Sequence, residues 1–161
     1  MIRTCTRRRS LRSKRWSPSW NRSPSMTAAE FDRLVSEAIA ALPAPVRDRL
    51  EELVVEVQPF ATDAQIREQG MDPDTDDLLG LFEGVADVDR GPEVSGLLPS
   101  RIYLFQEAIE DEAADIHANE GGALEDHVRE EIRRTLWHEV AHQYGLDDEE
   151  LHQLEEQRGW R

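Results

Sequence analysis

The sequence predicts one α+β domain over residues 26–161, because helical and strand patterns both occur along it and no internal repeat is visible. Residues 28–42 place apolar side chains at helical spacing, and a longer helical pattern runs from Ala123 to Gly145. Between them, residues 101–106 (RIYLFQ) alternate as a strand does. A chain of 161 residues is long enough for one domain with a modest core.

The first predicted helix has signals at both ends. Thr27 is a favourable N-cap, and Glu30 completes a capping box three residues later. Pro43 and Pro45 are expected to end the helix, because proline lacks the amide that a helix interior needs. The apolar face of the helix consists of Phe31, Leu34, Val35, Ala38, Ile39 and Leu42.

The middle of the chain predicts short strands separated by loops. The next strand stops at Pro59, and residues 60–77 are polar and predict a loop with room for one helical turn. Residues 77–87 (DLLGLFEGVAD) predict another short strand, and residues 90–100 a second loop. One face of the strand before Pro59 consists of Leu53, Val55 and Val57.

The C-terminal half predicts one strand and three helices. Residues 107–120 predict an acidic helix that breaks at two consecutive glycines, and the long helix that follows should end at Gly145. Residues 147–159 predict a final helix whose acidic residues lie at its N-terminus, where the helix dipole favours them. In the strand over residues 101–106, Ile102 and Leu104 lie on one side and Tyr103 and Phe105 on the other.

Charge is distributed unevenly along the chain. Residues 1–25 hold eight basic and no acidic residues, whereas the whole chain has a formal net charge of −15. Residues 26–161 therefore carry −23, and a field of that sign repels phosphates. We expect no nucleic-acid partner for the folded domain. Residues 1–25 predict a disordered basic extension, with a nucleic-acid-binding arm as the alternative.

Several protein classes are disfavoured by what the sequence lacks. No apolar run approaches the roughly 20 residues that span a bilayer. No apolar stretch of a secretory signal follows the basic start, so we expect a cytoplasmic protein without membrane association. The single cysteine, Cys5, excludes an internal disulfide and a cysteine-rich zinc site.

The stretch WHEVAHQYGLDD, residues 137–148, has a spacing typical of a catalytic zinc site. His138 and His142 are four residues apart, so they project from the same helix face and can bind one zinc ion through their imidazoles. Glu139 lies about 100° further around the helix, where it can hold a metal-bound water and accept its proton.

A third ligand must come from beyond the helix. Gly145 lets the chain turn sharply, so that a carboxylate can return to the metal. We expect Asp148 to be this ligand, with Asp147 as the alternative if the turn differs by one residue. The opposite arc of the helix is apolar, which predicts that the helix buries its back and presents the histidines to a cleft. That arc consists of Ile132, Leu136, Trp137, Val140 and Tyr144.

HEVAHQYGLDD resembles the extended zincin motif H-E-x-x-H-x-x-G-x-x-D. With LLGLFEG, RIYLFQ and IRRTLWHEVAHQYGLDDEEL, it is similar to the small bacterial zincin-like metallopeptidases, or minimal metalloproteases, over residues 27–157. The resemblance implies a small mixed sheet packed against an N-terminal helix and a long active-site helix. It implies zinc bound by His138, His142 and Asp148, with Glu139 as the base. An aspartate stands where metzincins commonly have a third histidine, and no methionine turn follows the motif.

The expected activity is zinc-dependent hydrolysis of peptide bonds through a zinc-bound water that Glu139 activates. Residues 101–106 are the expected sheet edge for an extended peptide substrate, with a plain core role as the alternative. The alternative function is a non-enzymatic acidic interaction protein with a structural zinc site, which a fourth protein ligand such as His152 would indicate. A metallohydrolase that acts on a non-peptide amide is a third reading. His117 and His127 are expected on the surface.

Overall fold

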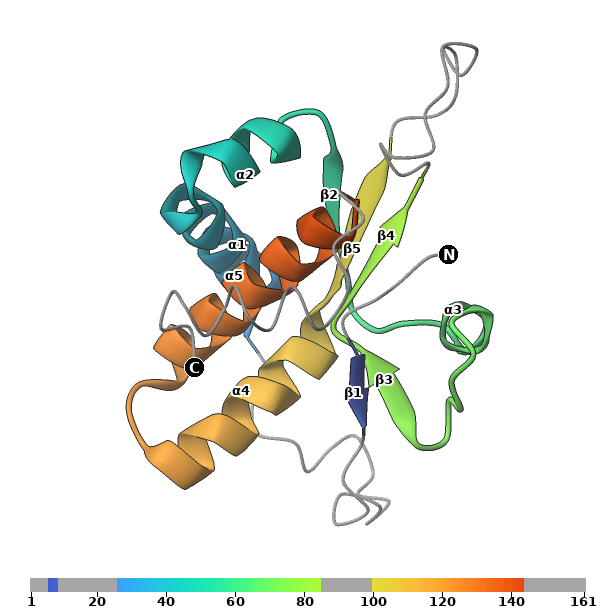
Figure 1. The fold of residues 1–161 in the computed structure, drawn as a ribbon. Coiled ribbons are helices and arrows are strands. Elements are labelled where there is room, and N and C mark those ends of the chain that lie inside the picture. Colours follow the sequence, from blue (N-terminus) through green and yellow to red (C-terminus); the bar gives the residue numbers. More distant parts are fainter. Residues whose placement is uncertain (1–5, 9–25, 85–99, 144–161) are drawn as a thin grey trace, which may run out of the picture.

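The computed structural model describes residues 6–8, 26–84 and 100–143. Helices and strands are mixed along these ranges, as an α+β protein requires (Figure 1). In chain order the elements are β1 (Thr6–Arg8), α1 (Ala28–Ala41), α2 (Ala44–Leu50), β2 (Val54–Gln58), α3 (Asp63–Glu68), β3 (Asp76–Leu78), β4 (Gly80–Glu83), β5 (Arg101–Phe105), α4 (Gln106–Glu120) and α5 (Leu124–Gln143).

A three-stranded mixed sheet supports the candidate site. Its strand order is β2-β5-β4, with β5 parallel to β2 and antiparallel to β4. The expected small mixed sheet is therefore confirmed. In the register of the antiparallel pair, Gly80 lies opposite Leu104 and Phe82 opposite Ile102.

The long helix α5 is the centre of the fold. It packs against α1 on one side and α4 on the other, and its C-terminal half lies against β4 and β5 (Figure 1). The expected packing of the sheet against the long helix is thus observed, and the N-terminal helix α1 packs against that helix. Because α5 contacts the other helices and also the sheet, the residues near its C-terminal end lie at the sheet.

The boundaries of α1 follow from its sequence. The Thr27 hydroxyl accepts a hydrogen bond from the Glu30 amide at 3.3 Å, and the Glu30 carboxylate accepts one from the Thr27 amide at 2.8 Å. The predicted capping box is therefore confirmed. The helix ends at Ala41, before the two prolines, as expected.

The short helix α2 was not predicted. Pro43 occupies its N-cap position and Pro45 lies in its first turn. Amides of a first helical turn have no acceptor within the helix, so a proline there loses no hydrogen bond and its fixed φ suits the start of a helix. The same prolines that end α1 therefore begin α2.

Two further elements differ from the sequence prediction. The single strand expected over residues 77–87 is observed as β3 and β4, which Leu79 separates; residues 85–87 lie outside the described part. Strand β1 pairs antiparallel with β3 and places Arg7 opposite Asp77. Regular structure was not expected there, because residues 1–25 have no periodic apolar pattern.

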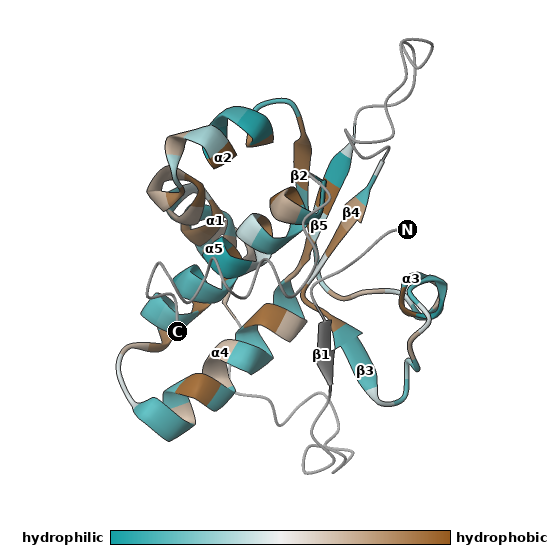
Figure 2. Ribbon diagram, viewed as in Figure 1, coloured by the Kyte–Doolittle hydropathy of each residue, from teal (hydrophilic) through white to brown (hydrophobic). Residues whose placement is uncertain are grey.

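One hydrophobic core joins the sheet to the helices. Figure 2 shows apolar ribbon on β2 and on parts of β4 and β5, and alternating apolar and polar residues along α4. Burial of these side chains is the main stabilising contribution to such a fold. The largest fully buried apolar side chains are Phe31, Leu34, Leu78, Ile102, Leu104, Phe105, Ile109, Val128, Ile132 and Leu136.

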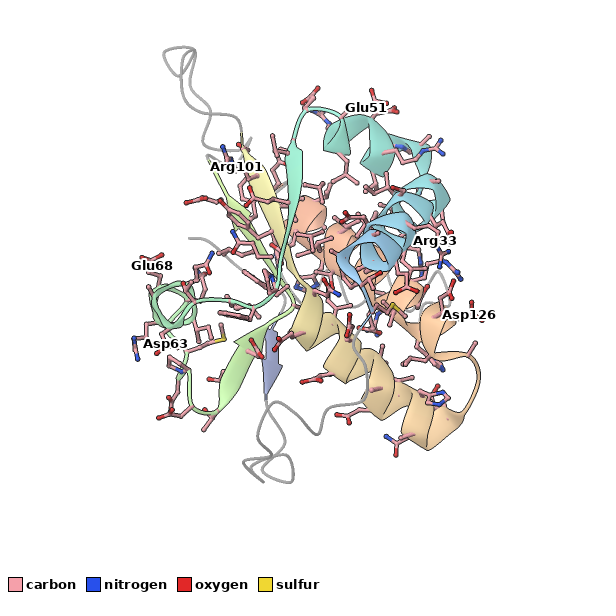
Figure 3. The ribbon with its side chains drawn as sticks, turned by 180° about the vertical axis from the view of Figure 1, so that it is seen from behind. Arg33, Glu51, Asp63, Glu68, Arg101 and Asp126 are labelled. Atoms are coloured by element: carbon pink, nitrogen blue, oxygen red, sulfur yellow. The ribbon has the colours of Figure 1, made fainter. Side chains whose placement is uncertain are left out.

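Ion pairs connect α1 to the start of α5 at the surface. Arg33 contacts Glu125 at 2.7 Å, and Arg129 contacts Glu37 at 2.8 Å, so each helix supplies one arginine and one glutamate. Figure 3 shows Arg33 on the periphery of the molecule on the same side as Asp126 near the start of α5. The network lies far along α5 from the sheet and keeps the first turns of the helix against α1.

Candidate active site

Helix α5 brings the two motif histidines together. The ring centroids of His138 and His142 are 4.3 Å apart and the rings are nearly perpendicular, at 89°. Both residues are partly buried, and the Nε2 atom of His142 is buried. The predicted opposite arc is confirmed where it is described, since Ile132, Leu136 and Val140 are all buried. The helix thus turns its apolar back to the core.

The carboxylate between the histidines is completely buried. Glu139 has a side chain with 0% exposure, and its Oε2 accepts a hydrogen bond from the backbone N–H of Phe82 at 3.0 Å. Burying an ionised carboxylate is costly unless hydrogen bonds compensate, and a bond from an amide to a charged oxygen is stronger than a neutral one. Strand β4 therefore supplies part of what holds this side chain in place.

The two imidazoles are chemically suitable for zinc. Neutral imidazole nitrogen is a common zinc ligand, and adjacent rings on one helix face can approach one ion. Within residues 26–84 and 100–143 there is no group of three or more His, Cys, Asp or Glu side chains that could hold a metal. The expected third ligand Asp148, its alternative Asp147, and Gly145 and His152 lie outside the described residues.

A comparison with models of known protein families shows to which family the chain belongs. The model of the zincin-like metallopeptidase family matches residues 50–158, which are 109 of the 161 residues. This chain belongs to the zincin-like metallopeptidase family. The match includes β2, β4, β5 and α5, which are the elements that build the candidate site. No curated protein matches the sequence.

Family membership supports the general class of chemistry. In general, zincin-like metallopeptidases use zinc to hydrolyse peptides or proteins. In this zincin-like metallopeptidase, the histidine pair and Glu139 lie inside the matched region. The described part of the chain has no helix long and apolar enough to cross a membrane.

The expected substrate edge was wrong. Residues 101–105 form β5, which is the central strand, and its two edges are occupied by β2 and β4. The alternative, a core role, is what the structure shows, since Ile102, Leu104 and Phe105 are fully buried. Apolar side chains on both faces are typical of a central strand. The edge beside Glu139 belongs to β4 instead.

The other residues that the sequence analysis named make contacts within the fold. Trp137 is 7% exposed and packs in the core, as predicted. His117 is exposed and His127 partly buried, with ring centroids 6.2 Å apart, and Nε2 of His127 lies 2.6 Å from the carbonyl oxygen of Gly121. His127 therefore contacts the end of α4. On β5, the hydroxyl of Tyr103 donates to Glu83, which together with burial raises the pKa of Tyr103.

Gly80 is the site residue that the sequence analysis did not identify. A Cβ atom placed on it would lie 2.5 Å from Cγ2 of Thr135 and 3.3 Å from Cγ of Glu139. Only a glycine lets β4 approach α5 this closely. A glycine inside an apolar strand pattern was the available signal, because such a residue often marks a close approach of the backbone.

Proposed function

We propose that this zincin-like metallopeptidase is a zinc-dependent endopeptidase whose catalytic base is Glu139. The observation that carries the proposal is the arrangement on α5: two imidazoles on one face and a buried carboxylate between them in sequence, hydrogen-bonded to the adjacent edge strand. We expect His138, His142 and Asp148 to bind the zinc, with Asp147 as the alternative third ligand.

Each group has a defined task in peptide hydrolysis. When bound, zinc supplies a Lewis acid that polarises the scissile carbonyl and makes water more acidic. Glu139 orients the attacking water, accepts its proton on the carboxylate and transfers it to the leaving amine. Its buried position fixes the direction of that transfer, because the Phe82 amide leaves the carboxylate little freedom to rotate.

Strand β4 is the proposed docking edge for the substrate. Its one neighbour in the sheet, within the part that the structure describes, is β5, and we propose that an extended peptide adds as a strand at its other edge. The Phe82 amide on this strand is already used by Glu139. A paired substrate would therefore take its main-chain hydrogen bonds from other groups of β4.

The proposal is tested with the full chain and a Glu139→Gln variant. Zinc content is measured by mass spectrometry, and cleavage is measured on a mixed peptide library. We expect E139Q to retain zinc and to lose cleavage by at least about 100-fold, the usual contribution of a general base. Glu130→Gln on the same helix is the matched control and should retain both properties. A zinc-loaded E139Q that cleaves peptides as fast as wild type would contradict the mechanism.

The alternatives make different predictions in the same experiment. A structural zinc site has four protein ligands, which X-ray absorption spectroscopy would detect, and it would show no cleavage. A hydrolase for non-peptide amides would bind zinc and require Glu139, but would leave the peptide library intact. The expected location, the bacterial cytoplasm, is a separate proposal that fractionation of cells expressing a tagged chain would test.

A further inference from the structure

The hydrogen-bonding direction of β4 places two of its amides on the edge beside α5. The Phe105 amide donates to the carbonyl oxygen of Leu79 at 3.0 Å, so Leu79 faces β5. In an antiparallel pair, successive residues alternate between facing the partner strand and facing away from it. Leu81 therefore faces β5 like Leu79, whereas Gly80 and Phe82 direct their backbone groups to the other edge.

The carboxylate of Glu139 satisfies one of these outward amides. Oε2 of Glu139 lies 3.0 Å from the Phe82 nitrogen, although the two residues are 57 positions apart in the chain. A buried, unpaired amide and a buried, unpaired carboxylate are both unfavourable, and this contact reduces both costs. The contact depends on the distance between the edge of β4 and the face of α5.

Gly80 sets that distance. Its φ is not among the positive values found at other glycines of the described chain, so its conformation is open to other residues. The restriction is steric: a Cβ would lie 2.5 Å from Cγ2 of Thr135 and 3.3 Å from both Cγ and Oε1 of Glu139. The contact with Thr135 is too short for real carbon atoms, so with any larger residue either the Thr135 side chain or β4 itself must shift.

We propose that Gly80 is a positioning residue for Glu139, and that it acts by letting the Phe82 amide reach the carboxylate. Gly80 has no side chain with which to take part in the reaction. The role of Glu139 as base rests on the proposed function, but the geometric relation among the three residues does not. The two parts are therefore tested by different measurements.

The geometric part is tested by amide hydrogen exchange in the full chain, measured by NMR. The Phe82 amide should be protected in wild type and in Glu139→Gln, since glutamine retains an acceptor oxygen. It should exchange at least about tenfold faster in Glu139→Leu, which is similar in size but has no acceptor. The Leu81 amide faces β5 and is the internal control: its protection should not change. Equal exchange of the Phe82 amide in E139Q and E139L would overturn the inference.

The role of Gly80 is tested by a substitution and its rescue. Gly80→Ala should accelerate exchange of the Phe82 amide at least about tenfold without exposing that of Leu81. Adding Thr135→Ser removes the clashing methyl group, and the G80A/T135S double variant should recover most of the protection. Thr135→Ser alone should behave as wild type. Unchanged Phe82 protection in G80A would overturn the proposal, and so would a double variant that recovers nothing.

The functional part uses zinc affinity and cleavage together. We expect G80A to bind zinc within about threefold of wild type, because both histidines lie on α5 and not on β4. Peptide cleavage should fall at least about tenfold and return in G80A/T135S. If wild type binds zinc but cleaves nothing, the proposed function fails while the exchange results still decide the geometry. If exchange responds as expected but G80A cleaves normally, the positioning role is refuted.

Discussion

Replacing Leu136 by alanine tests whether α5 is anchored through its apolar face. Leu136 has 0% exposure and belongs to the core with Ile132 and Val140. Truncating a fully buried leucine removes its transfer free energy and leaves a cavity, at a total cost of about 3–5 kcal/mol. Because a domain of this kind is stable by roughly 5–15 kcal/mol, the loss would be a large fraction of the free energy of unfolding. The expected fall in melting temperature is about 10 °C or more.

The assay is urea unfolding followed by circular dichroism of the helices, and the control comes from the same helix. Leu124 lies in the first turn of α5 and is 40% exposed. Its replacement by alanine should cost less than about 1 kcal/mol, because little apolar area is lost and alanine is the better helix former. If L136A and L124A lower the free energy of unfolding equally, the apolar back of α5 does not anchor the helix as described.

Two further predictions concern charge. Burial, only partly offset by Arg134, raises the pKa of Glu131, so the folded chain retains a proton that the unfolded chain loses above its ordinary pKa of 4.5. The contribution of Glu131 to the stability of wild type is therefore largest below that pH and falls as the pH rises. Glutamine does not titrate, so the free energy of unfolding of E131Q minus that of wild type should increase from about pH 4 to about pH 7. A relative stability that stays constant or falls over this range in urea unfolding would contradict the burial argument. Arg129 joins α5 to Glu37 of α1 and also pairs with Asp126. Both pairs are at least partly exposed and are screened by salt, so R129Q should lower the melting temperature slightly, and by less in about 1 M NaCl than in dilute buffer. An equal decrease at both salt concentrations would assign the effect to packing of the arginine stem.

The sequence predicted the elements whose signals are local. Helix α1 has an apolar stripe and a capping box, and it was found close to its observed bounds. Helix α5 combines a long apolar arc with the histidine spacing, and its predicted start lies one residue from the observed one, whereas its predicted end at Gly145 lies outside the described residues. Helix α2 was missed because its prolines are equally good as a stop signal and as a start signal. Local patterns do not say which of the two applies.

Strand pairing was the part that local patterns could not supply. The alternation in residues 101–106 identified a strand, but its two-sided apolar pattern indicates a central position, which the edge assignment overlooked. The pairing of β1 with β3 depends on a partner about 70 residues away, and nothing in the composition of residues 1–25 indicates it.

In the candidate site too, local sequence patterns predicted some features and not others. The histidine pair and Glu139 follow from helix periodicity alone, so their placement on α5 was predictable. The contact with the Phe82 amide was not, because every non-proline residue carries that group and no side chain marks it. Gly80 carried a weak signal, which becomes meaningful only once β4 is known to lie against α5.

The most direct test of the account is a zinc titration of the full chain by isothermal calorimetry, with circular dichroism to verify folding. We expect one zinc ion per chain for wild type and for His127→Gln, a histidine of the same helix that lies outside the site. We expect His142→Gln to remain folded and to lose this binding, because one of the paired imidazoles is gone. A folded wild type that binds no zinc, or an H142Q variant that binds it as tightly as wild type, would contradict the central claim.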